Sequence, residues 1–183
     1  MSGSQSINQS PYSRGAHYGV AFGVYLSVLF FAIAYSLTVP LLSLLSLMMM
    51  AGVPAVIYVM LRKSYVADYG KTIFSSLWME GIAIFFFGGL IASLVSVAYM
   101  TWINPGYLYS QVDMMIELYG SADWERGKEL SDMLVRAKEQ HLIPAPIDLA
   151  IDMLWLIVFS GSILSMLMSL LVQARGYGKK QAN

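Results

Sequence analysis

The sequence predicts an all-α integral membrane protein with four transmembrane helices and an amphipathic helical insert between spans three and four. Of its 183 residues, 57% are hydrophobic and 12% are charged, whereas soluble domains are about half apolar and about a quarter charged. The mean hydropathy is +0.62. Because so few charged side chains cannot cover a protein of this size in water, lipid is the expected solvent for most of the surface.

The first two spans share one uncharged run, from Gly19 to Leu61. A single helix over this run would be about 65 Å long, roughly twice the hydrocarbon thickness of a bilayer. Pro40 marks the break, because proline disfavours helical geometry in the residue before it and is well tolerated in the first turn of the next helix. We place the spans at residues 19–38 and 41–61.

The third span ends at Asn104-Pro105-Gly106, a strong helix stop. Counting about 20 residues back from Trp102 brings the other end close to Trp78, so we place this span at residues 78–103. Pro144 and Pro146 precede the last apolar run, which gives a fourth span at residues 149–172.

Residues 107–148 form a charged insert with eight acidic and four basic side chains. Apolar residues recur there at helical spacing on both sides of Gly120-Ser121, which predicts two amphipathic helices. We expect their apolar stripes to face the membrane or the ends of the spans. The stripes are Leu108, Val112, Met115, Ile116 and Tyr119 in the first helix, and Leu130, Met133, Leu134 and Ala137 in the second.

The remaining segments predict a flexible polar tail at residues 1–16, a single membrane domain at 17–176 and a basic tail at 177–183. Basic residues flank the spans mainly on one side, so the positive-inside rule places both termini and both tails in the cytoplasm and the insert outside. Arg136 and Lys138, close to the fourth span, count against this orientation. A cleaved signal peptide is the alternative for the N-terminus, but the apolar run continues past the usual length.

Glu80 is the candidate functional residue, because a carboxylate within a membrane span marks an ion, proton or ligand site by default. Trp78 beside it favours a position in the inner interface, where the charge costs little. A helix that starts at Thr72 would instead carry Glu80 about 12 Å inward. The interfacial interpretation is the expected one.

Small residues recur at every fourth position in three spans. In lipid, this spacing lets helix backbones approach closely. We therefore expect helix packing at Gly19 and Gly23 in the first span, Gly88 in the third and Gly161 in the fourth.

The residue inventory favours no enzyme, metal or cofactor. There is no cysteine. His17 and His141 belong to opposite predicted faces of the membrane, so they cannot bind one metal ion together within a single chain. Ser160-Gly161-Ser162 lacks a base, since no predicted span contains His or Lys. A net charge of zero also gives no basic field for nucleic acid.

The order of these parts resembles a known family. A tight first hairpin leads to a basic loop ending in Tyr69-Gly70-Lys71, and a Gly-rich third span runs into Trp102-Ile103-Asn104-Pro105. An acidic insert, a fourth span with Gly161 and a basic tail follow. Over roughly residues 15–176, the chain resembles the small four-span membrane proteins of Bacteroidota called domain of unknown function 4199. The resemblance implies a bacterial inner-membrane location, and it supplies no activity, catalytic residue or ligand.

We therefore expect a non-enzymatic accessory or scaffold protein of the inner membrane that presents the acidic insert at the periplasmic face. Membrane lipid, a second copy of the chain or another membrane protein is the expected partner. A small transporter or channel subunit that uses Glu80 is the alternative. A membrane enzyme acting on a lipid-linked substrate is the third hypothesis.

Overall fold

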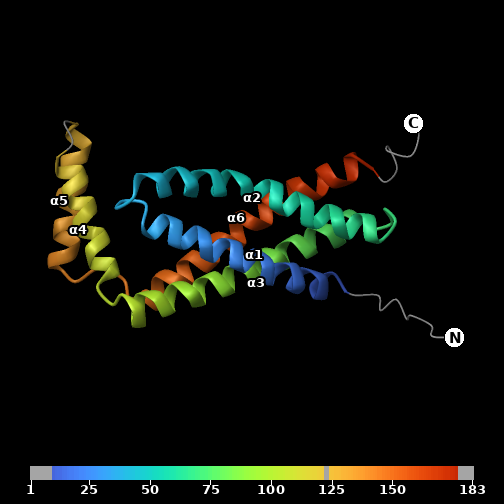
Figure 1. Cartoon of the computed structure of the whole chain (residues 1–183), viewed down its shortest axis with the longest axis horizontal. Helices are drawn as coiled ribbons and strands as arrows, with labels where there is room; N and C mark the ends of the chain where they lie inside the picture. The colour runs from blue at the N-terminus through green and yellow to red at the C-terminus, as the bar shows by residue number, and fades with distance from the viewer. Residues whose placement is uncertain (1–9, 122–123, 177–183) are drawn as a thin grey trace. The chain divides into compact units, whose positions relative to one another are not determined.

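The protein is all-helical over the residues that its computed structural model describes, 10–121 and 124–176. Figure 1 shows the helices in chain order by colour. The chain divides into two compact units. Unit 1 takes in the chain up to Ala92 and again from Leu154, and unit 2 is Ser93–Met153. Each unit is described by itself.

Within the described residues, four helices are long and apolar enough to cross a membrane. They are α1 (Pro11–Ala34), α2 (Pro40–Ala67), α3 (Phe74–Ala98), continued by the π-helical turn η1 (Tyr99–Ile103), and α6 (Pro146–Ala174). The prediction of an all-α membrane protein with four spans is confirmed. Each helix begins before its predicted span, whereas α1 ends at Ala34, short of the predicted end at residue 38.

The first helix begins at Pro11, so the predicted flexible tail at residues 1–16 is wrong for its last six positions. Ser10 is the N-cap, and its side chain accepts a hydrogen bond from the backbone N–H of Ser13 at 3.3 Å. Pro11 occupies the first helical turn, where its missing N–H costs nothing. Residues 1–9 and the predicted basic tail from residue 177 lie outside the described residues.

Helix α2 continues through Pro54, which removes one backbone donor. One turn earlier, the hydroxyl of Tyr25 in α1 donates a hydrogen bond to the carbonyl oxygen of Met49. The absence of a side chain at Gly52 permits this approach, since a Cβ there would lie 3.1 Å from the Tyr25 hydroxyl. The two helices are thus joined beside the proline.

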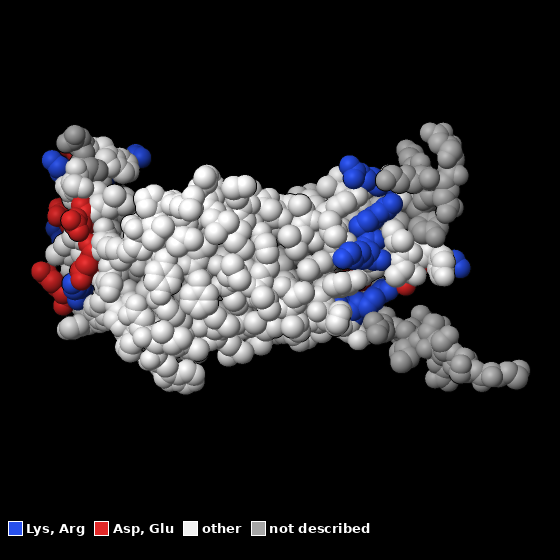
Figure 2. All heavy atoms as spheres, in the orientation of Figure 1, with Lys and Arg blue, Asp and Glu red and all other residues white. Residues whose placement is uncertain are grey.

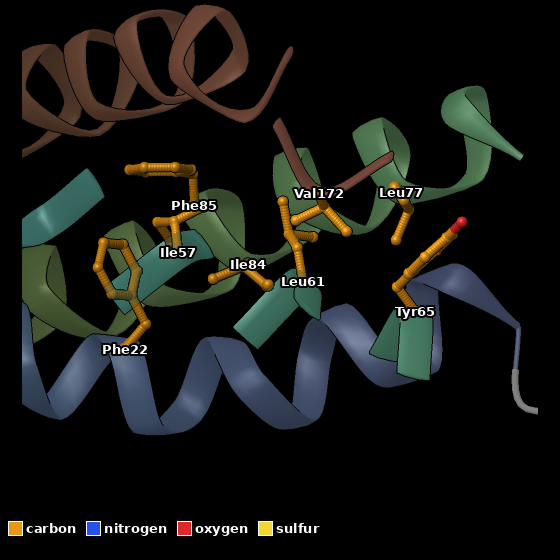
Figure 3. Packing of buried hydrophobic residues seen from close by; sticks show 8 residues of the cluster. All are labelled: Phe22, Ile57, Leu61, Tyr65, Leu77, Ile84, Phe85 and Val172. Atoms are coloured by element: carbon orange, nitrogen blue, oxygen red, sulfur yellow. The ribbon is translucent and has the colours of Figure 1, made fainter. Parts of the chain in front are cut away.

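The apolar core of unit 1 draws on all four long helices (Figure 3). Phe22 packs edge-to-face on Phe85, with ring centroids 5.0 Å apart. The other buried members are Ile57, Leu61, Tyr65, Leu77, Ile84 and Val172. The buried residues of α2 all follow Pro54, so this helix joins the core through its C-terminal half.

Unit 2 contains the ends of α3 and α6 and a hairpin of α4 (Tyr107–Gly120) and α5 (Glu125–Glu139). The two predicted helices of the insert are therefore present, and Gly120-Ser121 ends the first. The hairpin is closed by small residues. Ser131 lies 3.3 Å from the Cβ position of Gly120 and donates a hydrogen bond to the carbonyl of Ile116 at 3.1 Å.

Candidate functional site

Glu80, the residue singled out by the sequence, lies in the second turn of α3 with none of its surface exposed. The hydroxyl of Ser64, on α2, donates a hydrogen bond to its Oε1 atom. Leu77 and Ile84, one turn to either side on α3, belong to the core. The interfacial interpretation placed this carboxylate near water, whereas the protein itself encloses it.

Arg14, from the first turn of α1, supplies the opposite charge. Its Nε atom lies 3.5 Å from Oε2 of Glu80, and its Nη1 atom lies 2.6 Å from Oδ2 of Asp68. The second distance is that of a charge-assisted hydrogen bond, while the first is too long for one. Arg14 therefore links a buried carboxylate to a more exposed one.

Asp68 caps the C-terminal end of α2, and its side chain is 37% exposed. Thr72 donates a hydrogen bond to its Oδ2 atom at 2.7 Å. Partial burial by itself raises the pKa of Asp68, but the hydrogen bonds from Thr72 and Arg14 and the charge of Arg14 outweigh burial and hold that pKa below its ordinary value of 3.8. Asp68 is thus held as a carboxylate at neutral pH.

Four buried polar side-chain atoms of the described residues have no hydrogen-bond partner: Arg14 Nε, Glu80 Oε2, Ser165 Oγ and Ser169 Oγ. Buried polar groups in proteins are rarely left unpaired, and each one costs about 1–3 kcal/mol. All four belong to unit 1. The site therefore retains unused hydrogen-bonding capacity.

The predicted packing residues lie where helices of unit 1 approach most closely. A Cβ on Gly19 would be 2.7 Å from Cβ of Phe87, and one on Gly88 would be 2.7 Å from Cδ1 of Phe22. These glycines, with Gly23 against Ile91, form a seam along which α1 and α3 run parallel.

Gly161 belongs to the contact between α6 and α3. A Cβ at this position would come within 2.2 Å of Cγ of Phe85. One turn earlier on α3, a Cβ on Gly81 would lie 2.6 Å from both Cβ and Oγ of Ser165, which is one turn later on α6, so the two helices are antiparallel.

Basic side chains gather at the end of unit 1 where α1 and α3 begin and α2 and α6 end, and the acidic side chains of unit 2 lie mainly on α4 and α5 (Figure 2). At the basic end, Arg62 donates a hydrogen bond to the carbonyl of Gly176 at 2.8 Å, and Arg175 lies over the ring of Tyr58. Lys63 and Lys71 are exposed there.

Sequence reasoning found Glu80 but missed Arg14, Ser64 and Asp68. Arg14 was assigned to the flexible tail, although Ser10-Pro11 is a helix-start signal that would have placed it on α1. The start of the predicted fourth span at residue 149 would put Asp152 in its first turn. It lies in the second turn, because α6 begins at Pro146.

Four apolar helices and a helical hairpin define a multi-pass membrane protein. The chain belongs to the family described as protein of unknown function DUF4199, whose model matches residues 17–174. Comparison with curated proteins and with solved structures gave no match.

Proposed function

We propose that this protein is a non-enzymatic accessory protein of a bacterial inner membrane, in which the long helices are an anchor and the α4–α5 hairpin is the docking element for a membrane or periplasmic protein. The observation that carries this proposal is the surface of the hairpin. Its helices are joined by their own contacts, yet large apolar side chains stay exposed among charged ones.

The exposed apolar side chains of the hairpin are Tyr109, Met115, Leu118, Trp124, Leu130 and Met133. Met133 is 65% exposed and Leu118 is 55% exposed. Aromatic residues and methionine are enriched in protein interfaces. An interfacial lipid-binding helix is usually rich in Lys and Arg, whereas acidic residues outnumber basic ones here. These features favour a protein over lipid headgroups.

The basic end of unit 1 supports the proposed orientation. Arg14, Arg62, Lys63, Lys71 and Arg175 lie where two of the long helices begin and two end. By the positive-inside rule, this end and both termini are cytoplasmic, which leaves the hairpin in the periplasm.

A photo-crosslinking amino acid at Met133 tests the docking role in native membranes. We expect one discrete protein adduct, which can be identified by mass spectrometry. Phe159, 71% exposed on the apolar helix α6, is the matched control position and should give only lipid adducts. If Met133 also gives only lipid adducts, the docking role must be abandoned.

A small transporter or channel subunit is the second candidate, because Glu80 is a buried carboxylate with an unpaired oxygen. Complementation of a deletion strain separates the two. If the protein has the accessory role, Glu80→Gln should complement the deletion strain. Failure of Glu80→Gln together with success of Glu80→Asp would favour transport.

A further inference from the structure

The unpaired polar atoms of unit 1 come from three helices, α1, α3 and α6. Glu80 Oε2 and Arg14 Nε are 3.5 Å apart without a hydrogen bond between them. Ser165 packs against Gly81, the residue next to Glu80, and Ser169 lies one turn further along α6. Both serines have no exposed surface and an unpaired Oγ.

This arrangement has the composition of a hydrated site. Buried waters typically make about three hydrogen bonds to polar groups that otherwise lack partners, and genuinely empty cavities are apolar. In lipid, the polar groups of a span must be satisfied within the protein or by water inside it. A water molecule beside Oε2 and Nε could bond both atoms. The unpaired hydroxyl of Ser165 lies against Gly81, the next residue of α3.

The charges that face Glu80 come from two helices. Arg14, on α1, is the cation, and Asp68, at the end of α2, is a second carboxylate beyond it. Ser64 contributes a neutral hydrogen-bond donor, and Ser165 of α6, which packs against Gly81, is also uncharged. The cluster of Arg14, Asp68 and Glu80 therefore carries one net negative charge when both acids are ionised.

We propose that Glu80 is a proton-binding site reached through internal water, with Arg14 as its counter-ion. A proton from the basic end of unit 1 passes by water to Oε2 and forms one O–H bond, so the carboxylate becomes a carboxylic acid. Arg14 keeps its bond to Asp68. The cluster then has no net charge, which is the state that a low-dielectric surrounding favours.

This site is independent of the docking role of the hairpin, since all of its residues belong to unit 1. Glu80 is also set apart from the other glutamates of the chain. Those four, Glu117, Glu125, Glu129 and Glu139, are all exposed on α4 and α5.

Infrared difference spectroscopy tests the proposal on the full-length protein in liposomes. The protein is made with glutamate labelled with ¹³C at the side-chain carboxyl, and spectra are compared over the pH range in which circular dichroism stays constant. We expect a labelled carboxylic-acid band to grow as the pH falls and to shift in D₂O without unfolding. The exposed glutamates carry the same label, so the Glu80 signal is the component of the band that is lost in Glu80→Gln and kept in Glu117→Gln, the matched exposed control.

Identical difference spectra for the native protein and Glu80→Gln would overturn the proposal, because Glu80 would then not change its protonation state. A band that fails to shift in D₂O would overturn the proposed access of water to Glu80. If Glu80→Gln does not fold, Glu80→Asp replaces it. The Glu80 component of the band should then move from the labelled glutamate position to the unlabelled aspartate position, and an undiminished band at the glutamate position would exclude Glu80.

Discussion

Single residues decide how closely the helices of unit 1 approach, and Gly161 is the clearest case. Its Cα lies against the ring of Phe85, where an added methyl group would come within 2.2 Å of Cγ. Phe85 is itself packed on Phe22, so the ring cannot swing away freely. A small change at Gly161 therefore spreads to the whole aromatic contact.

Gly161→Ala should lower the free energy of unfolding by about 1–3 kcal/mol, the usual cost of overpacking. Ser160→Ala is the matched control, since Ser160 is exposed and its hydroxyl bonds only to its own helix. Equilibrium unfolding of both variants in mixed detergent micelles measures the difference. Equal stabilities would show that the α3–α6 contact is looser than described.

Asp68 makes the free energy of unfolding depend on pH in the acid range. Because its pKa in the folded protein lies below the ordinary value of 3.8, its stabilising effect is complete above that pH and is lost as the pH falls through the lower, folded-state pKa. At neutral pH, the free energy of unfolding of the native protein should exceed that of Asp68→Asn by less than about 1 kcal/mol, since the carboxylate is partly exposed.

The difference between the native protein and Asp68→Asn should shrink in acid when unfolding is followed as a function of pH. Glu117→Gln, which removes an exposed carboxylate of α4, is the control. A difference that grew as the pH fell would contradict the assigned ion pair between Asp68 and Arg14.

The helices themselves were more accessible to prediction than their contacts. The lengths of the apolar runs and the prolines at their ends, such as Pro40 and Pro146, predict four spans, and Gly120-Ser121 divides the insert. The partners of Glu80 were not predictable in this way, because Arg14 and Ser64 reach it from two other helices. The apolar stripe of α5 was also only partly informative, since Leu130 and Met133 are exposed.

At the scale of the hairpin, Ser131 holds α5 against α4. Ser131→Val removes its hydrogen bond to Ile116 and adds a methyl group where little of the side chain is exposed. Hydrogen exchange should become faster in both α4 and α5, and exchange in unit 1 should not change. Asp132→Ser, at the exposed neighbouring position, should leave exchange in the hairpin as it was. Fast exchange throughout the hairpin of the native protein would contradict an ordered docking element.

For the whole molecule, topology is the decisive measurement. A reporter active only in the periplasm should work when fused at Glu125 and fail at Ala67, and the protein should remain in the membrane during alkaline carbonate extraction. Both expectations follow from the four apolar helices and the basic end of unit 1. The opposite reporter pattern would reverse the proposed orientation and place the hairpin in the cytoplasm.

The ion pairs of Arg14 also bear on how the chain is made. During synthesis α1 leaves the ribosome well before Asp68, its partner 54 residues later, and before Glu80, which follows in α3. Until then the guanidinium has only water or lipid phosphate to satisfy it, and an arginine near a helix end stays at the interface under those conditions. We therefore expect the first span to reach its final depth only after the third has entered the translocon. The helices α1, α2 and α3 should then be present together in one intermediate of membrane insertion.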